Sequence, residues 1–372
     1  MARDCKRMNL LHNNRGIVEF GGIVLRWRRE IGMRKILTAA LLLLVTAGTS
    51  HAQQTTIVVS AYAASVDQYR RDLFDPFEKM CGCKVVLDLG NSAERLTKLD
   101  ARKDNPNIDV AVLTTFNALE AARKGLIDKV DVERLSNYAD IFDFAKDPLG
   151  DHWAVGYTFY SNSIAYRTDK LPAVSSWTDL WSPAMSGHVA LPNISSSQAP
   201  LVLSMAEEAF GGQSPKFETG IAKIGELKTG IVTFYERSAQ LIQLFQSEEI
   251  WAAPIGRFDW AAVRSLKLPI AWASPKEGQP AGMNVIVLVK GSKNRELALR
   301  LMDYWLSVEV QTKLGQDLVD SPANSKVKLS DQAAQNLTYG SEATSHLHFI
   351  APADILTNRA AWLEGWNAHI AR

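Results

Sequence analysis

"SPKEGQPAGMNVIVLVKGSKN", residues Ser274–Asn294, is the stretch that decides the fold of this chain. It starts as a loop with two prolines and two glycines and runs directly into a five-residue apolar strand, Val285–Val289. A basic turn beginning at Lys290 and a long amphipathic segment follow. The junction, AGMN at 281–284, has no nucleophile, acid or base, so nothing in it indicates catalysis.

Upstream of this loop the chain alternates strand and helix patterns in two series. The first series has strand patterns at 55–62, 84–89 and 108–114 and helix patterns at 65–80, 92–103 and 116–124. After an aromatic-rich segment, the second series has strand patterns at 188–193, 230–235 and 250–255 and helix patterns at 199–210, 238–247 and 258–266. This alternation predicts an α/β fold with mainly parallel sheets.

The aromatic-rich segment, 147–167, separates the two series and predicts two α/β lobes. We expect a first lobe at 53–158, a second lobe at 159–284, and a final segment, 285–372, that returns to the first lobe and ends in helices. The chain then crosses between the lobes near residues 158 and 284. The crossing strands would act as a hinge, and ligands bind in the cleft between such lobes.

The first 52 residues have the features of an export signal. Residues 33–35 (MRK) are basic, 36–47 form an apolar run, and Ser50 and Ala52 place small residues before a cleavage site. The apolar run is shorter than the roughly 20 residues that span a bilayer. We predict a secreted, periplasmic protein that is cleaved after Ala52; residues 1–32 would then be an upstream extension, and Met33 is the alternative start.

The charge distribution argues against nucleic-acid binding. The whole chain has 41 Lys and Arg and 40 Asp and Glu, but nine of the basic and three of the acidic residues lie in the first 52. The remainder has 32 basic and 37 acidic residues, so it lacks the excess of basic residues that nucleic-acid binders carry. This part also contains Cys81 and Cys83, which either form a disulfide in an oxidising compartment or simply lead into a strand.

Fragments spread over nearly the whole chain after residue 53 resemble one known family. They read DPFEKMCGCKVVLDLGNSAERLTKL, SIAYRTDKL, SSWTDLWSPAMSGHVALPN, EIWAAPIGR and PKEGQPAGMNVIVLVKGSKN. In this order they are similar to extracellular solute-binding proteins of bacterial ABC importers, in the branch of the polyamine, iron and thiamine binders. The resemblance implies a two-lobed fold of the type II periplasmic binding proteins, a small polar solute such as a polyamine, and an ABC permease in the inner membrane as partner.

The resemblance also implies a role for the loop that begins at Ser274 and leads into the apolar strand. It implies that the loop brings the chain back across the hinge, where small residues let the backbone approach the ligand. In polyamine binders this point has an aromatic residue and an aspartate that hold an amine, whereas this chain has Gly282 and Asn284. Their loss weakens cation binding by about 1–2 kcal/mol each, so a zwitterionic, anionic or neutral polar solute is an alternative ligand.

Polar residues follow the strands of the first lobe, at the sheet edge where α/β proteins bind ligands. Tyr62 follows the first strand, and Thr114 and Thr115 end the third; each of these residues contacts either the ligand or the core. Asn91 and Ser92 stand at a helix N-terminus, where they either contact an anion or carbonyl group of the ligand or cap the helix. Tyr157 is the aromatic side chain that we expect to be exposed at the crossing.

The second lobe has corresponding positions. The serines of LPNISSSQAP offer hydroxyls and N–H groups to a ligand or cap a helix, and Glu236 pairs with a ligand cation or caps its own helix. Arg257 either holds a ligand carboxylate or phosphonate or pairs with Asp259 in a turn. The candidate ligand-binding residues are therefore Tyr62, Asn91, Ser92, Thr114, Thr115, Tyr157, Ser195, Ser196, Ser197, Glu236, Arg257, Asp259 and Asn284.

The predicted function is the substrate-binding component of an ABC importer, with no catalytic residue, no metal and no cofactor, acting as a monomer. The tyrosines of iron-binding relatives are missing, and His346 and His348 have no third ligand nearby. One alternative is an exported two-lobed α/β enzyme that uses Glu236 or Asp259 as a cleft carboxylate. Another is a sensory module that reports a ligand to a receptor.

Overall fold

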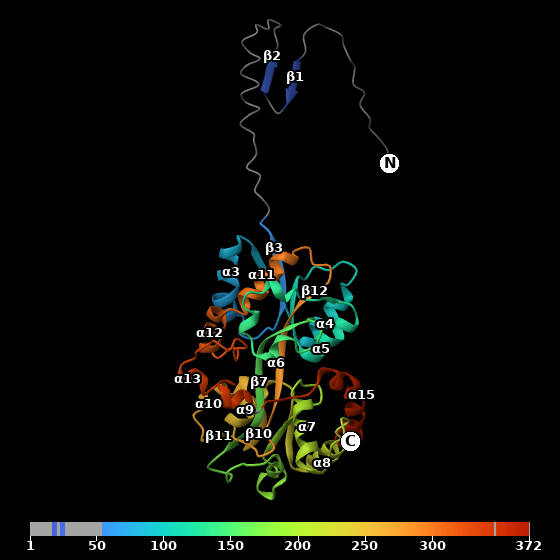
Figure 1. The fold of residues 1–372 in the computed structure, drawn as a ribbon, viewed down its shortest axis with the longest axis vertical. Coiled ribbons are helices and arrows are strands. Elements are labelled where there is room, and N and C mark those ends of the chain that lie inside the picture. Colours follow the sequence, from blue (N-terminus) through green and yellow to red (C-terminus); the bar gives the residue numbers. More distant parts are fainter. Residues whose placement is uncertain (1–16, 21–22, 27–53, 346, 372) are drawn as a thin grey trace, which may run out of the picture. The chain divides into compact units, whose positions relative to one another are not determined.

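The computed structural model describes residues 17–20, 23–26, 54–345 and 347–371. The predicted signal peptide, with Met33 and Ala52, lies outside the described residues. The chain divides into two units, 1–53 and 54–372. In the first unit, β1 (Ile17–Phe20) pairs with β2 (Ile23–Arg26) in antiparallel orientation. Figure 1 shows the second unit, which carries every strand and helix discussed below.

The second unit is organised around one continuous path of strands in the order β4-β3-β5-β12-β7-β10-β8-β9. The strands are β3 (Thr56–Ala61), β4 (Lys84–Leu89), β5 (Val110–Thr114), β6 (Ile127–Asp128), β7 (Val155–Arg167), β8 (Val189–Pro192), β9 (Ile231–Tyr235), β10 (Ala252–Gly256), β11 (Ile270–Trp272), β12 (Gln279–Val289) and β13 (Leu347–Phe349). β3, β4 and β5 are parallel to each other, and so are β8, β9 and β10. Two parallel sheets are thus joined through an antiparallel pair, β7 and β12.

The pair β7 and β12 is the connection between the two halves of the unit (Figure 1). β12 pairs with β5 over residues 284–288 and with β7 over 281–286, and β7 continues to pair with β10 over 162–166. The pairing explains why β12 starts at Gln279, six residues before the apolar run that predicted it, because the loop residues gain backbone hydrogen bonds from both β7 and β13.

Three separate groups of buried side chains fill the unit, one in the first lobe and two in the second, and they define the lobes. Lobe 1 is the core made by β3, β4, β5 and the β12 residues after Met283, and lobe 2 is the core made by β8, β10 and the later part of β7. In lobe 1, Trp305 is buried against Phe74, with ring centroids 5.5 Å apart. In lobe 2, Trp362 stacks on Phe217 at 4.7 Å. Since Trp362 belongs to the last helix, the segment after residue 285 is divided between the two cores.

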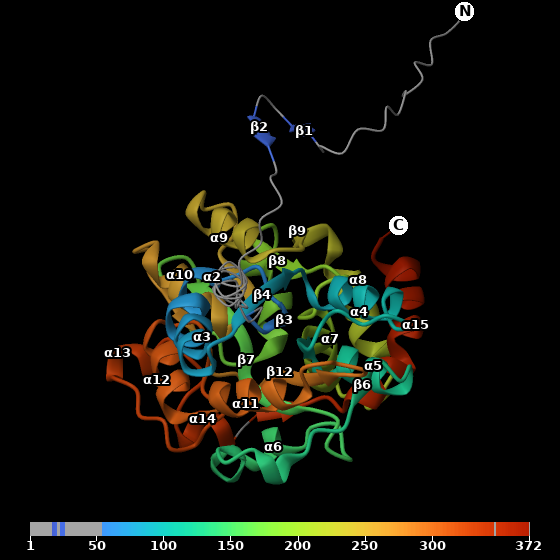
Figure 2. The ribbon, with the colours of Figure 1, turned by 90° about the horizontal axis from the view of Figure 1, so that it is seen from above.

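Helices cover both faces of the strands, as the view from above in Figure 2 shows. The α-helices are α2 (Val66–Tyr69), α3 (Asp75–Cys81), α4 (Ser92–Ala101), α5 (Thr115–Arg123), α6 (Asp143–Lys146), α7 (Ala199–Ala209), α8 (Glu218–Leu227), α9 (Ser238–Gln246), α10 (Trp260–Ser265), α11 (Arg295–Trp305), α12 (Val308–Gln316), α13 (Asp331–Ala334), α14 (Ser341–Ser345) and α15 (Pro352–His369). A π-helical turn, η1 (Arg70–Phe74), links α2 to α3, and the 3-10 turns are η2 (Val132–Arg134), η3 (Tyr138–Asp140), η4 (Trp177–Trp181), η5 (Pro183–Met185), η6 (Lys228–Gly230) and η7 (Arg257–Asp259).

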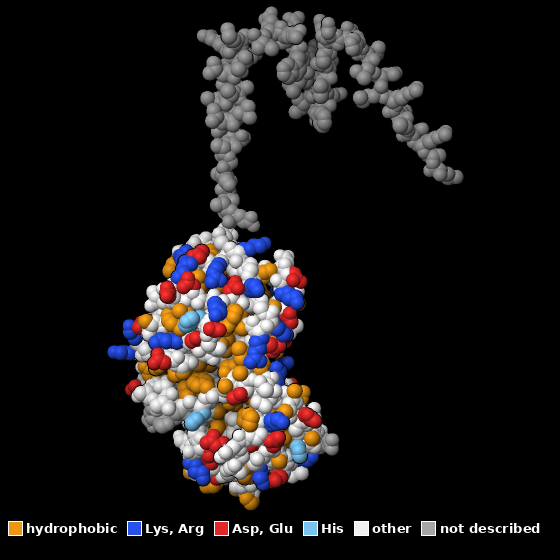
Figure 3. All heavy atoms as spheres, turned by 45° about the vertical axis from the view of Figure 1, so that its right-hand side comes forward, with side chains coloured by type: hydrophobic (Ala, Val, Ile, Leu, Met, Phe, Trp, Pro, Cys, Tyr) orange, Lys and Arg blue, Asp and Glu red, His pale blue; other side chains and the backbone are white. Residues whose placement is uncertain are grey.

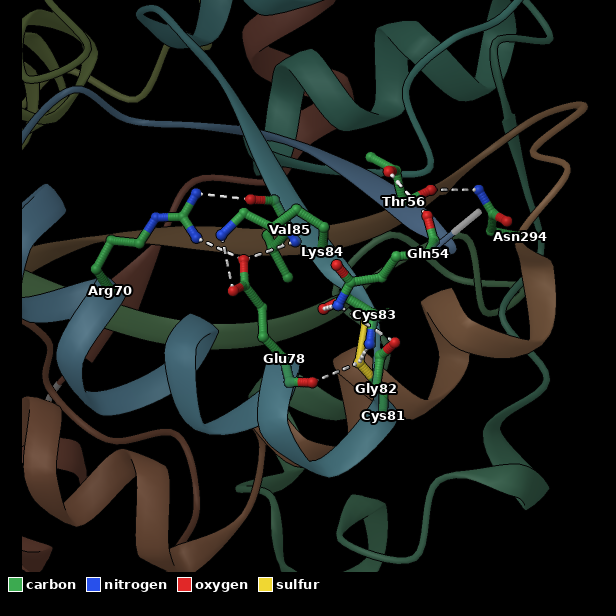
Figure 4. The surroundings of a disulfide bond; sticks show 10 residues. All are labelled: Gln54, Thr56, Arg70, Glu78, Cys81, Gly82, Cys83, Lys84, Val85 and Asn294. Carbon is green, nitrogen blue, oxygen red and sulfur yellow. Dashed lines mark hydrogen bonds and ion pairs between the residues drawn. A yellow bond between two sulfur atoms is a disulfide. The ribbon is translucent and has the colours of Figure 1, made fainter. Parts of the chain in front are cut away.

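Cys81 and Cys83 form a disulfide at the turn between α3 and β4 (Figure 4). Gly82 between them has φ +64°, a left-handed conformation that glycine adopts without a Cβ clash. The Gln54 side chain donates a hydrogen bond to the Cys83 carbonyl oxygen at 3.1 Å, and the Glu78 carboxylate accepts one from the Val85 N–H at 2.8 Å. The turn is therefore held by side chains as well as by the disulfide.

Candidate functional site

A small cavity lies where the two lobes meet the crossing strands, and we call it the interlobe pocket. Its volume is about 30 Å³, and its lining includes Thr114 and Thr115 from lobe 1, Ser197 from lobe 2, and Tyr160 and Gly282 from the crossing strands. Three of the predicted ligand residues thus come together from distant parts of the sequence. A cavity of this volume holds a single water molecule, so a solute of several heavy atoms requires the lobes to move apart.

Tyr62 is held in a defined position on the lobe 1 side. Its hydroxyl donates a hydrogen bond to Asn284 Oδ1 at 2.9 Å, and the Arg95 guanidinium lies 3.8 Å from the centre of its ring. Arg95 is fully buried, and its Nε donates to the Val112 carbonyl oxygen at 2.7 Å. Burial raises the pKa of Tyr62, with Arg95 acting in the opposite direction, so this hydroxyl is a neutral donor and acceptor.

The N-termini of α4 and α5 form a satisfied polar network rather than an open anion site. Asn91 caps α4 in a capping box: its side chain accepts from the Glu94 N–H at 2.9 Å, and the Glu94 carboxylate accepts from the Asn91 N–H. Ser92 is buried, and its Oγ accepts from the Thr114 N–H at 3.0 Å and from Asn117 Nδ2 at 2.9 Å. Asn91 therefore makes the contacts of a helix cap, whereas Ser92 joins the start of α4 to the start of α5.

Asp320 is a carboxylate that the sequence analysis missed. It accepts hydrogen bonds from the hydroxyls of Tyr69 and Thr158, and burial raises its pKa to about 6. Its charge also contributes to the raised pKa values of Tyr62 and Tyr157, so it lies near both rings. The residue is a single aspartate after an apolar run, and nothing in its sequence neighbourhood distinguishes it from a surface residue.

Asp259 is the corresponding carboxylate of lobe 2. It is 5% exposed and accepts hydrogen bonds from Ser238 and Gln198, but its Oδ2 has no hydrogen-bond partner within the described part of the chain. Burial raises the pKa of Asp259 to about 7, and its charge contributes to the raised pKa of Tyr160. Neither Asp259 nor Asp320 takes part in an ion pair among the described residues.

Tyr160 lies near Asp259, and the position of its ring requires a glycine at residue 282. Its ring packs edge-on against Phe258, with centroids 4.7 Å apart. A Cβ on Gly282 would lie 2.3 Å from Tyr160 Cζ, closer than any real contact of that kind. Because Gly282 has no side chain, the tyrosine ring lies across the strand at this point.

The other predicted residues lie elsewhere or make only local contacts. Tyr157 is 2% exposed and packs against Trp305 in the lobe 1 core, so the prediction that it is exposed is wrong. The pairing of β7 with β12 shifts register at this point, between Asn284 and Val285. Ser195 and Ser196 hydrogen-bond within their own loop, and Glu236 is exposed at the end of an edge strand. Arg257 does not pair with Asp259; its guanidinium stacks over Trp272 instead.

Within the described part of the chain, no group of three or more His, Cys, Asp or Glu is placed to hold a metal ion. His348 lies in β13, and His346 is outside the described residues. No helix among the described residues has both the length and the apolar character needed to cross a bilayer.

Residues 72–339 match the family model of the bacterial extracellular solute-binding proteins. The chain belongs to this family. A crystal structure of an ABC transporter protein from Clostridium perfringens has 31% sequence identity and a TM-score of 0.76, and the match covers 84% of this chain and 99% of that one. The fold prediction is thereby confirmed: this solute-binding protein has two α/β lobes joined by hinge strands, as in type II periplasmic binding proteins.

Curated relatives give the same assignment. The putrescine/cadaverine-binding protein of Pseudomonas aeruginosa is 26% identical over 292 residues, covering 71% of this chain and 79% of the relative. The spermidine/putrescine-binding periplasmic protein of Escherichia coli is 24% identical over 254 residues, covering 66% and 72%. The predicted function, a solute-binding component of an ABC transporter, is confirmed, and the alternative of an exported enzyme finds no support in these matches.

Proposed function

We propose that this solute-binding protein captures a small solute with at least one primary amine, and that Asp259 is the acceptor for the ammonium group. The observation that carries the proposal is the buried Oδ2 of Asp259, which has no donor within the described residues. A buried carboxylate oxygen without a donor costs free energy, and an ammonium group supplies both the missing hydrogen bond and the missing charge. The two curated relatives are named as binders of putrescine, cadaverine or spermidine, which are amines of this kind.

The ligand-binding surface in this proposal consists of Asp259, Tyr160 and Ser197 on the side of lobe 2 and of Tyr62, Thr114, Thr115, Asn284 and Asp320 on the side of lobe 1. Asp320 supplies a second carboxylate near Tyr62, where Asn284 is neutral. A solute with two amines would therefore contact one carboxylate from each lobe, and closing the lobes over the solute would bring both into contact with it.

We further propose where this protein acts and to what it delivers its solute. The protein acts in the periplasm as a monomer, after cleavage behind Ala52, and delivers its solute to a permease of the inner membrane without catalysing a reaction. Lobe 1 extends over 53–158 and lobe 2 over 159–284, and the segment 285–372 contributes side chains to both cores. Delivery to a permease is the role of the family, and the absence of a covalent step agrees with a site built from carboxylates, tyrosines and hydroxyls.

The experiment uses protein purified from the periplasmic fraction and compares putrescine with 1,4-butanediol, which has the same length but no amine. Isothermal titration calorimetry should show saturable binding of putrescine or another amine and none of the diol. At pH 6, in two buffers of different ionisation enthalpy, amine binding should release protons, because the ammonium group lowers the raised pKa of Asp259. Equal binding of amine and diol would contradict the proposal.

A further inference from the structure

A second cavity, much larger than the interlobe pocket, lies along the crossing strands. Its volume is about 520 Å³, enough for a small organic molecule, and its lining includes Ser161 of β7, Gln279 of β12 and Thr338 from the segment after α13. We call it the hinge cavity. Figure 3 shows one face of the unit, on which apolar side chains gather between its two halves.

The hinge cavity and the interlobe pocket share no lining residue. Side chains of successive residues in a strand point to opposite faces, and the Cβ direction of Gly282 meets the ring of its partner Tyr160. Tyr160 and Gly282 line the interlobe pocket together with Ala281, whereas Ser161, the next residue of β7, lines the hinge cavity. The two cavities are therefore separate.

Arg257 brings a positive charge to the hinge cavity. Its guanidinium carbon lies 4.4 Å from the centre of the Trp272 ring, which also lines the cavity. Its Nη2 donates to the Gln335 carbonyl oxygen at 2.7 Å, but its Nε is buried and has no hydrogen-bond partner within the described residues. Burial, followed by the charge of Arg264, lowers the pKa of Arg257 to about 10, so the group stays charged at neutral pH.

No carboxylate neutralises this charge. Neither Arg257 nor Arg264 forms an ion pair among the described residues. Glu277 lines the cavity, but its carboxylate accepts hydrogen bonds from Ser176 Oγ and from the Trp177 N–H at 3.1 Å. Lys276 also lines the cavity and adds a second positive charge. A guanidinium with a free, buried N–H and no acidic partner is a site for an oxyanion.

We propose that the hinge cavity is a second binding site of this protein, for a small molecule with a carboxylate or phosphate group whose oxygen accepts a hydrogen bond from Arg257 Nε. The site is separate from the amine site, since Asp259 does not line the hinge cavity. The cavity is lined by both crossing strands and by residues from 334–343, so a bound anion contacts the elements that must bend when the lobes move.

The test titrates protein from the periplasmic fraction with inorganic phosphate and with succinate, at ionic strength held constant with sodium chloride. We expect saturable binding of at least one of them by calorimetry, with a change in tryptophan fluorescence that Trp272→Phe removes. Arg257→Gln should weaken the binding at least tenfold. The matched control Arg300→Gln, which removes an exposed arginine, should change it by less than twofold.

Two further variants distinguish loss of the anion site from misfolding of Arg257→Gln and from changes at the amine site. Ala343→Phe fills the hinge cavity from an exposed position and should weaken anion binding even if Arg257→Gln does not fold. Asp259→Asn should leave anion binding unchanged, because it alters only the amine site. The proposal is overturned if neither anion saturates, if Arg257→Gln and Ala343→Phe both bind like the wild type, or if Asp259→Asn abolishes anion binding.

Discussion

Two neighbouring residues of one turn differ in the charge that they leave without a partner. Asp259 has a buried oxygen without a donor, and Arg257 has a buried N–H without an acceptor, within the described residues. The two are separated only by Phe258 within one 3-10 turn, yet they do not pair: Arg257 lies over the Trp272 ring, whereas Asp259 accepts from Ser238 and Gln198. An ion pair would neutralise both charges; keeping them apart leaves one group suited to a cation and the other to an anion.

The largest expected effect comes from removing the charge of Asp259. Asp259→Asn should weaken amine binding by about 100-fold, roughly 2.7 kcal/mol, because a charge-assisted hydrogen bond in a buried site is lost. Calorimetry with the amine that binds the wild type measures it. Asp104→Asn, which changes an exposed loop carboxylate, serves as the control. If Asp259→Asn binds the amine as tightly as Asp104→Asn, the contrast between Asp259 and Arg257 does not concern this ligand.

The pH dependence of stability is the next largest effect. Aspartate in an unfolded chain has a pKa near 3.9, whereas that of Asp259 is about 7 in the folded protein. Between these values the folded protein binds more protons than the unfolded chain, so stability decreases as pH rises, by up to about 1.4 kcal/mol per pH unit for this group. Urea unfolding at pH 5, 6 and 7 should show a smaller decrease in the free energy of unfolding for Asp259→Asn than for the wild type. If the free energy decreases equally in both proteins, Asp259 is already charged over this pH range.

A moderate effect should follow from changing Asn284 on the lobe 1 side. Asn284→Asp adds a carboxylate that still accepts the Tyr62 hydroxyl. Affinity for a diamine should increase by about five- to tenfold, since a new charge-assisted contact contributes about 1 kcal/mol. Asn284→Ser, which adds no charge, is the control. If Asn284→Asp and Asn284→Ser both weaken diamine binding, Asn284 contacts the solute through its amide or positions Tyr62.

The smallest effect should come from the disulfide, which is remote from both cavities. Replacing Cys81 and Cys83 by serine opens a loop of only three residues, so stability should decrease by less than about 2 kcal/mol. Affinity for the amine and for the anion should each change by less than twofold. A larger change in either affinity would mean that the two sites depend on the packing of lobe 1 at a distance, and not on the local charges alone.

Local sequence patterns predicted much of the fold because they describe interactions within a few residues. The strand at 84–89 occurs as predicted, and Asn91 caps its helix, one of the two alternatives that the sequence left open. The start of β12 and the burial of Tyr157 did not follow from local patterns, since both depend on strand pairing between lobes. Asp320 was missed for a similar reason, because only the folded chain brings it to Tyr69 and Thr158, more than 150 residues away in sequence.

The sequence by itself determined the α/β class, the division into two series of strands and helices, and the resemblance to solute-binding proteins. These features follow from hydrophobic periodicity, helix capping and the order of the fragments, which need no distant contact. Only the tertiary structure decided which charged groups remain without partners and which neighbours surround each one. A charge is satisfied or left free by atoms that folding brings near it, and those atoms come from segments that the sequence places far apart.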